Sequence, residues 1–260
     1  MKIEFVKYQG TGNDFILIDG RNDNFEDLPV KWLCDRRFGI GADGLMILKS
    51  MENFDFEMIY YNSDGNISSM CGNGGRCISK WAHNLGLGDN NRVVFNAIDG
   101  AHEAVINAKT VALKMTDVNS WEVSDSDTYI LNTGSPHYVS FQPENDLEKF
   151  DLVNWAKGIR YNDRFKMEGI NVNLVTISEP NKLVMRTYER GVEDETFSCG
   201  TGVTAASLSY ALKQDNNIKK VQVKTPGGDL SVAFERTASG FSNIWLEGPA
   251  DFVFKGEIIL

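Results

Sequence analysis

The sequence contains the segment Cys71-Gly72-Asn73-Gly74-Gly75, and 128 residues after Cys71 it contains Cys199-Gly200-Thr201-Gly202. Each segment leads into a stretch with helical character. A second pair of landmarks lies upstream, Gly12-Asn13-Asp14-Phe15 and Gly134-Ser135-Pro136-His137, at a spacing of 122 residues. Two matched landmarks at nearly the same spacing predict two duplicated halves, in which equivalent residues are expected to face each other across a cleft.

Short runs with strand character recur along the chain and outnumber the helical patterns. The helical patterns are Pro29–Phe38, a stretch around Ile78–Leu85, Leu152–Lys157 and Val203–Leu212. Such a mixture, without regular strand and helix alternation, predicts an α+β fold with mostly antiparallel sheet. The polar segment Asn119–Thr128 predicts a boundary between an N-terminal half, residues 1–118, and a C-terminal half, residues 119–249.

The composition limits the classes of partner. With 26 basic and 36 acidic residues, the chain has a net charge of −10 and no basic cluster, so we expect no nucleic-acid partner and no anionic membrane surface. No apolar run has the length of a signal peptide or a membrane span, which predicts a cytoplasmic protein. The four cysteines form no Cys-x-x-Cys pair, so neither a disulfide framework nor a metal site is expected.

A cysteine directly before a helix has its sulfur near the positive end of the helix dipole, which lowers the thiol pKa. The following glycines allow a carboxylate to approach the free backbone N–H groups at that helix start. Two such thiols on opposite sides of one carbon could remove and deliver an α-proton and so invert the centre without metal or cofactor. The alternative is that Cys71 and Cys199 are small buried apolar residues, the commoner fate of a free cysteine. The repetition of the motif favours chemistry, whereas for Cys34 and Cys77 we expect core packing.

Further polar residues could line the same cleft and hold the ammonium and carboxylate groups of an amino acid. They are Asn13, Asn62, Asn171, Glu189 and Arg190. His137 could adjust the protonation of a thiol or could be a structural residue, and the sequence leaves both interpretations open. The stretch Gly39–Gly44 matches the dinucleotide-binding pattern by letter, but a helical pattern precedes it and a strand follows it, the reverse of the required order.

Taken together, these motifs resemble the diaminopimelate epimerase family over nearly the whole chain. The resemblance runs through the segments Gly10–Phe15, Gly39–Gly44, Tyr61–Gly65, Cys71–Cys77, Gly134–His137, Arg186–Gly191, Ser198–Gly202 and Pro226–Gly228. It implies two pseudo-symmetric domains, each a sheet wrapped round a central helix, with the active site between them, and a homodimer. It also implies that residues 250–260 return to the first domain as its last strand.

The same resemblance implies a cofactor-independent reaction that interconverts LL- and meso-2,6-diaminopimelate, a step toward lysine and peptidoglycan precursors. Cys71 and Cys199 would be the two bases, and the N–H groups of Gly72, Asn73, Gly200 and Thr201 would hold the reacting carboxylate. The substrate contacts implied for the side chains are those of Asn13, Asn62, Asn171, Glu189 and Arg190. His137 and Glu189 would adjust the two thiols.

Three features depart from the family pattern. Ser135 stands where an asparagine is usual, Gly44 stands where some members have glutamine, and the segment Gly191–Ser198 is longer and more acidic. Distal substrate recognition is therefore the least constrained part of the prediction. Two other functions stay open: a related racemase acting on proline or hydroxyproline, and a non-catalytic protein that binds an amino acid or uses the two thiols for redox chemistry.

Overall fold

The computed structural model describes residues 2–23, 25, 27–68, 70–143, 147, 149–214 and 217–260. Contacts divide the chain into two compact units, Met1–Leu113 with Gly248–Leu260, and Lys114–Glu247. The boundaries predicted from the sequence, after residues 118 and 249, are a few residues further toward the C-terminus than these. Each unit is described below by itself.

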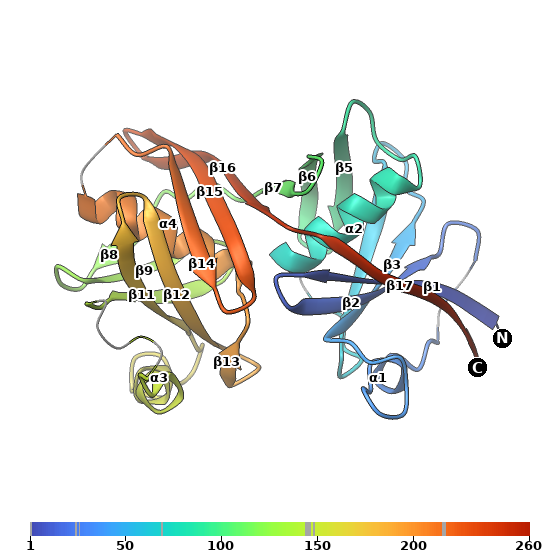
Figure 1. The fold of residues 1–260 in the computed structure, drawn as a ribbon, viewed down its shortest axis with the longest axis horizontal. Coiled ribbons are helices and arrows are strands. Elements are labelled where there is room, and N and C mark those ends of the chain that lie inside the picture. The colour runs from blue at the N-terminus through green and yellow to red at the C-terminus, as the bar shows by residue number, and fades with distance from the viewer. Residues whose placement is uncertain are drawn as a thin grey trace. The chain divides into compact units, whose positions relative to one another are not determined.

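The first unit consists of strands around one long helix (Figure 1). Its elements are β1 (Lys2–Gly10), β2 (Asn13–Asp19), α1 (Val30–Leu33), β3 (Gly44–Lys49), β4 (Phe56–Asn62), α2 (Gly72–Asn84), β5 (Arg92–Ala97), β6 (Gly100–Ile106), β7 (Val111–Lys114) and β17 (Asp251–Ile259). The last strand, β17, pairs antiparallel with β1, so the C-terminal segment belongs to the first unit.

Among its described residues, the second unit has the same plan, again with two helices, and one additional strand, β13. Its elements are β8 (Trp121–Val123), β9 (Thr128–Asn132), β10 (Pro136–Phe141), α3 (Leu152–Arg160), β11 (Asn171–Glu179), β12 (Lys182–Glu189), β13 (Asp194–Thr196), α4 (Gly200–Gln214), β14 (Lys220–Thr225), β15 (Gly228–Thr237) and β16 (Gly240–Gly248). Helix α3 packs against β11 and β12.

The two units have the same strand topology. From β1 to β7, successive pairings are antiparallel, parallel, antiparallel, parallel, antiparallel and antiparallel. From β9 through β12 to β14–β16, the second unit repeats this series without a change. The extra strand is equivalent too, because β17 pairs with β1 as β8 pairs with β9. The fold is therefore α+β, mostly antiparallel, and internally duplicated.

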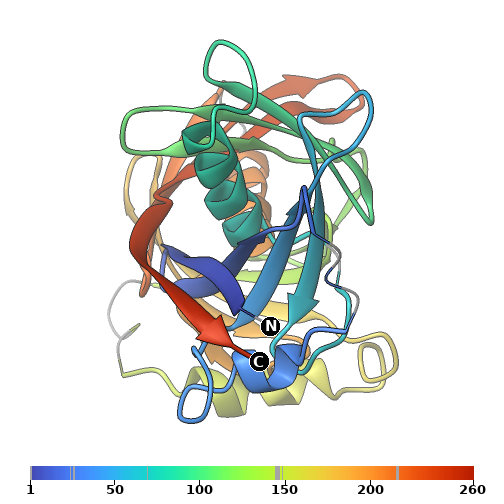
Figure 2. The same ribbon diagram turned by 90° about the vertical axis from the view of Figure 1, so that its right-hand side faces the viewer.

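Each unit has a central helix whose composition suits burial. Helix α4 is buried from Gly202 to Ala211, and its many Gly, Ala, Ser and Thr side chains allow strands to approach it from several sides. It packs against β9, β10, β11, β12, β14 and β15. Helix α2 packs against β1, β2, β3, β5 and β6, and Figure 2 shows it among the strands of its unit. The N-terminal ends of these two helices carry the repeated cysteine motifs.

One local prediction was wrong, and one strand was not predicted. The expected helix over Pro29–Phe38 is reduced to α1, because the Asp35 carboxylate accepts the N–H groups of Arg37 and Phe38 and forms a turn instead. The expected boundary Asn119–Thr128 contains β8, which pairs with β9. All three residues of β8 are exposed, so it lacks the alternation that reveals a strand in sequence.

Candidate active site

The two motif cysteines occupy the same position in their helices. The Cys71 carbonyl accepts the N–H of Gly75 at 2.7 Å, and the Cys199 carbonyl accepts the N–H of Val203 at 2.9 Å. Each cysteine is therefore the N-cap, with its sulfur at the start of a central helix. The first-turn N–H groups of Gly72, Asn73, Gly200 and Thr201 point toward the same end. Each unit thus brings a thiol together with an anion-binding helix start.

In the first unit, Cys71 lies beside an amide oxygen. Its Sγ is 3.6 Å from Asn13 Oδ1, which also accepts Asn73 Nδ2 at 3.4 Å. The Asn13 Nδ2 group donates to Asp43 Oδ2 at 2.6 Å, and this fixes the orientation of the amide. Because an amide oxygen can only accept, the thiol of Cys71 is the donor in this contact.

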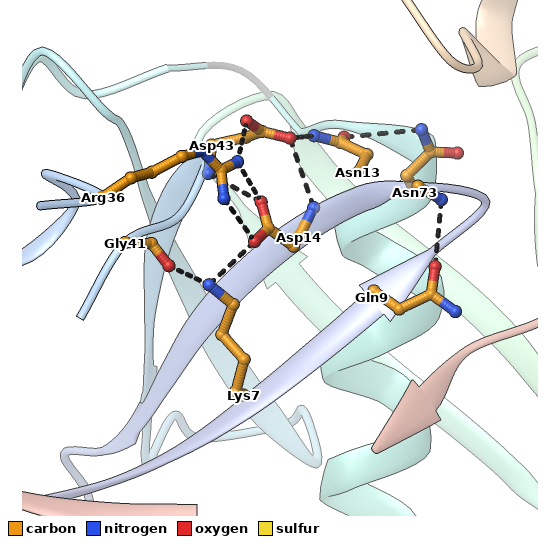
Figure 3. A network of polar contacts seen from close by, with 9 residues as sticks. Lys7, Gln9, Asn13, Asp14, Arg36, Gly41, Asp43 and Asn73 are labelled. Atoms are coloured by element: carbon orange, nitrogen blue, oxygen red, sulfur yellow. Dashed lines mark hydrogen bonds and ion pairs between the residues drawn. The ribbon is translucent and has the colours of Figure 1, made fainter. Parts of the chain in front are cut away.

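An ion network that extends from the buried Lys7 to the exposed Arg36 holds Asp43 and Asn13 in place (Figure 3). Asp14 contacts Lys7 Nζ at 2.8 Å and Arg36 at 2.7 Å, and Arg36 also contacts Asp43 at 2.8 Å. Burial raises the pKa of the Asp14 carboxyl, but the hydrogen bonds and charges of Arg36 and Lys7 outweigh it and lower the pKa to about 2. Lys7 also donates to the carbonyl of Gly41, so the loop rejected as a nucleotide motif carries part of the Cys71 environment.

Arg76 is a residue of this half-site to which the sequence analysis gave no role. Its guanidinium is fully buried and donates to Gly72 O at 3.2 Å, to Asn73 Oδ1 at 3.0 Å and to Thr11 Oγ1 at 3.3 Å. These bonds tie the first turn of α2 to the β1–β2 turn. The sequence offered one signal for this role of Arg76, which is its position four residues after Gly72, on the inner face of the helix.

In the second unit, Cys199 lies beside hydroxyl groups and an imidazole. Its Sγ is 3.3 Å from Thr201 Oγ1, which is 2.9 Å from His137 Nε2 and 3.1 Å from Ser135 Oγ. His137 is fully buried. Burial lowers the pKa of its imidazole to about 3, and the charge of Arg190 acts in the same direction. The ring is therefore neutral at physiological pH.

Of the predicted binding residues of the second unit, Asn171 lies beside Ser135 and also contacts the backbone of Arg190. Asn171 Nδ2 donates to Ser135 Oγ at 3.1 Å and to the Pro136 carbonyl at 3.0 Å. Asn171 Oδ1 accepts the backbone N–H of Arg190 at 2.9 Å, while Glu189 accepts the Thr196 hydroxyl at 3.1 Å. In the first unit, Asn62 begins a turn in which its carbonyl accepts the N–H of Gly65 at 2.9 Å.

The departures from the family pattern have local structural reasons. A Cβ added at Gly44 would lie 2.7 Å from the Tyr61 carbonyl oxygen and 2.5 Å from the Tyr60 ring, so this chain has no room for a longer side chain there. In the acidic segment Gly191–Ser198, the Glu193 carboxylate accepts Arg160 at 3.0 Å, Tyr161 OH at 2.9 Å and Tyr188 OH at 3.0 Å. Glu193 thereby joins the turn after β12 to the end of α3.

The other two cysteines are buried, as predicted. Burial raises the pKa of the Cys34 thiol to about 12 and raises that of the Cys77 thiol well above its ordinary value. Neither is a competent base near neutral pH. In the described part of the chain, no group of three or more His, Cys, Asp or Glu side chains is arranged to hold a metal ion. Among the same residues, no helix is long and apolar enough to span a bilayer.

The two-unit fold defines a structural class. It is similar to a phenazine biosynthesis protein of the PhzF family from Bacillus anthracis, with a TM-score of 0.75, 14% identity and full coverage of both chains. It is also similar to a hydroxyproline epimerase from Agrobacterium vitis, with a TM-score of 0.66, 14% identity, and coverage of 100% of this chain and 93% of that one.

Sequence comparison identifies the family within this class. The family pattern described as diaminopimelate epimerase matches residues 5–121 and 129–253. A diaminopimelate epimerase from Flavobacterium psychrophilum is 48% identical, covering 98% of this chain and all of the relative. One from Chlorobaculum tepidum is 40% identical, covering 96% and 99%. The chain belongs to the diaminopimelate epimerase family.

Proposed function

We propose that this protein is a diaminopimelate epimerase that interconverts LL- and meso-2,6-diaminopimelate with two cysteine bases. The observation that carries the proposal is the pair of N-cap cysteines, Cys71 and Cys199, at equivalent places in two units of identical topology. Family membership supports the substrate, and the Asn171, Glu189 and Arg190 cluster supplies polar groups suited to an amino acid.

The immediate contacts of the two sulfurs support different resting protonation states. Cys71 faces the acceptor Asn13 Oδ1, which favours the thiol, whereas Cys199 faces the Thr201 hydroxyl, a potential donor that favours the thiolate. In the proposed reaction, the Cys199 thiolate removes the α-proton of one isomer while the Cys71 thiol protonates the opposite face of the same carbon. The reverse reaction begins from the opposite protonation state.

The carbanion formed between these two steps needs stabilisation. In the proposal, the substrate carboxylate is held by the helix-start N–H groups of Gly72, Asn73, Gly200 and Thr201. Negative charge that develops on the carboxylate then meets two helix dipoles, each equivalent to roughly half a positive charge. An oriented N–H donor in such a position contributes about 3 kcal/mol to the lowering of a barrier. The proposed reaction therefore uses no cofactor.

The cellular setting follows from the same proposal. The enzyme would act in the cytoplasm on a free amino acid, in the supply of lysine and peptidoglycan precursors, without a nucleic-acid or membrane partner. We also propose a homodimer. Consecutive apolar residues of β17, Phe252, Val253 and Phe254, are 54%, 50% and 42% exposed, and Ile259 is 81% exposed. A strand that exposes apolar side chains on both faces is suited to a protein interface.

The test is proton NMR of LL-2,6-diaminopimelate with purified, reduced protein in deuterated water. We expect the meso isomer to form with deuterium at the inverted α-carbon. Cys71→Ser and Cys199→Ser should each lower the rate by more than about a hundredfold, since a serine hydroxyl is a far weaker acid and base at neutral pH. Cys34→Ala is the matched control, because it removes a cysteine that is buried and has a raised pKa.

Three results would contradict the proposal in different ways. Wild-type turnover by either serine variant would remove the two-base mechanism. Exchange with proline or hydroxyproline, but not with diaminopimelate, would assign the chain to a related racemase. Saturable binding without any exchange at the α-carbon would indicate a non-catalytic protein that binds an amino acid.

A further inference from the structure

The duplicated topology shows where the two units differ in chemistry. The strand registers make His137 the equivalent of Phe15, Asn173 the equivalent of Met46, and Thr187 the equivalent of Tyr60. In the first unit, these three positions carry a compact group in which Phe15 packs edge-on against Tyr60. In the second unit, all three carry buried polar side chains, none more than 2% exposed.

The polar group of the second unit is fully connected by hydrogen bonds. Thr187 Oγ1 donates to Asn173 Oδ1 at 3.1 Å, and Asn173 Nδ2 donates to the Tyr138 carbonyl at 3.1 Å. Asn173 Nδ2 is also 3.0 Å from His137 Nδ1. Burying polar groups in place of apolar ones costs stability, and the cost is offset where every group has a partner. A network kept in one unit and absent from its twin indicates a task specific to that unit.

The Tyr138 carbonyl determines the direction of this network. A carbonyl can only accept, so the atom of Asn173 facing it is the nitrogen. The same nitrogen then donates to His137 Nδ1, which leaves Nδ1 without a hydrogen. The imidazole is neutral, and its hydrogen is therefore on Nε2, the atom that faces Thr201 and Ser135. Gly202 leaves space for this arrangement, since a Cβ there would lie 2.5 Å from Asn173 Oδ1.

A second carboxamide fixes the remaining hydrogens. Asn171 Nδ2 faces the Pro136 carbonyl, so it is also the donor to Ser135 Oγ. His137 Nε2 also donates to Ser135 Oγ. Of the three groups that contact Ser135 Oγ, only Thr201 Oγ1 can therefore accept the hydrogen of the Ser135 hydroxyl. Thr201 Oγ1 therefore accepts from His137 and Ser135. Its own hydrogen is directed to Cys199 Sγ, 3.3 Å away.

We propose that Asn173 is a positioning residue for Cys199, holding His137 in the Nε2–H tautomer so that the Thr201 hydroxyl donates its hydrogen to the Cys199 thiolate. The same tautomer excludes Ser135 as a nucleophile activated by His137, because Nε2 has no free lone pair to accept its proton. The inference rests on the proposed function for the use of the thiolate. The hydrogen-bond wiring itself does not depend on which substrate is bound.

The first test uses the wild-type protein without substrate. Nitrogen-15 NMR of protein labelled at histidine should show His137 Nδ1 without hydrogen and Nε2 with hydrogen, at pH 7 and unchanged to pH 5. Hydrogen on Nδ1 would overturn the inference. The result is independent of epimerase activity, so a failed activity assay and a failed inference are distinguishable.

The second test follows the reactivity of Cys199 against pH, by iodoacetamide alkylation and mass spectrometry of the Cys199 peptide. In Thr201→Val, the pH midpoint of Cys199 alkylation should rise by about one pH unit, which is a roughly tenfold loss of thiolate at neutral pH. The His137 tautomer should be unchanged in this variant. Asn173→Leu should also raise the midpoint and should add the Nδ1–H tautomer of His137. Arg190, whose charge acts on His137, and Glu189, at the end of β12, are kept in every variant.

The double variant distinguishes an effect through the hydrogen-bond network from a general disturbance of the fold. If Asn173 acts through Thr201, then Asn173→Leu with Thr201→Val should have the alkylation profile of Thr201→Val alone. If the two substitutions instead raise the Cys199 midpoint additively, the inference is overturned. Thr204→Val is the matched control, because Thr204 is buried in the same helix and its hydroxyl donates to the Gly200 carbonyl. Its Cys199 midpoint should equal that of the wild type. Should Asn173→Leu fail to fold, Asn173→Ser takes its place in both single and double variants.

Discussion

At the scale of residues, the two reactive sulfurs are chemically distinct although their backbones are equivalent. Cys71 faces an amide oxygen that is oriented by Asp43, and Cys199 faces a hydroxyl that is oriented by His137. Charged groups act on Cys71 through Asn13 and through the buried Arg76 guanidinium. Cys199 instead contacts the hydroxyl of Thr201, which is bonded to the neutral imidazole of His137. The environments of the two thiols should therefore respond to different substitutions and in different pH ranges.

The Asp43 carboxylate should matter for turnover because it orients Asn13. In Asp43→Asn, the amide of Asn13 loses its charged acceptor and can turn, so that Nδ2 replaces Oδ1 beside Cys71. We expect kcat/KM to fall about tenfold, or about 1.4 kcal/mol, with a small change in melting temperature. Asp19→Asn is the control, because Asp19 is also paired with an arginine, Arg21, in the same unit. Equal losses in both variants would contradict a specific role.

His137 should make the protein less stable in acid. Its folded pKa is about 3, below the ordinary value of 6.5, so between these values the unfolded chain binds the extra proton. The contribution of the neutral His137 to the free energy of unfolding is then fully present above pH 6.5. It falls with decreasing pH by about 1.4 kcal/mol per pH unit, down to about pH 3. Asp14, with a folded pKa of about 2 against 3.8, adds a loss below pH 3.8. Urea unfolding between pH 4 and 7 should show the first slope in the wild type and a shallower one in His137→Gln.

At the scale of elements, Glu193 explains the longer acidic segment. Its carboxylate contacts the end of α3 through Arg160 and Tyr161 and the end of β12 through Tyr188. Its backbone has a φ of 59°, and the N–H of Gly191 donates to the same carboxylate at 3.1 Å. The turn that carries Arg190 is thereby attached to a helix.

Removing the charge of Glu193 should loosen this turn. In Glu193→Gln, the hydrogen bonds from Arg160 and the two phenols lose their charged acceptor, so we expect unfolding free energy to fall by about 1.5 kcal/mol. Because Arg190 is in the turn, KM should rise more than kcat falls. Glu179→Gln, which loses a surface pair with Lys182, should leave both values near those of the wild type. Urea titration and steady-state kinetics measure the two effects, and a change in kcat alone would contradict the argument.

At the scale of the whole molecule, the repeated motifs at a spacing of 128 residues already predicted the duplicated α+β fold. The helix after Cys71 was predictable because Ile78, Trp81, Ala82 and Leu85 repeat with helical periodicity. Strand β8 was not, because all of its residues are exposed. The partners Asn173 and Thr187 were missed because their role depends on strand register, which places them beside His137. Aligning the two halves of the sequence through the motifs would have shown the exchange of Phe15, Met46 and Tyr60 for polar residues.

The proposed homodimer belongs to this scale because it uses a strand that completes the first unit from the far end of the chain. Its equivalent in the second unit, β8, provides a matched control: Val253 on β17 is 50% exposed and Val123 on β8 is 55% exposed. If β17 forms the interface, Val253→Lys buries a charge there, which costs several kcal/mol and shifts the protein to monomer. Val123→Lys should remain dimeric. Sedimentation velocity at micromolar concentration separates these outcomes, and a Val253→Lys dimer with wild-type affinity would place the interface elsewhere.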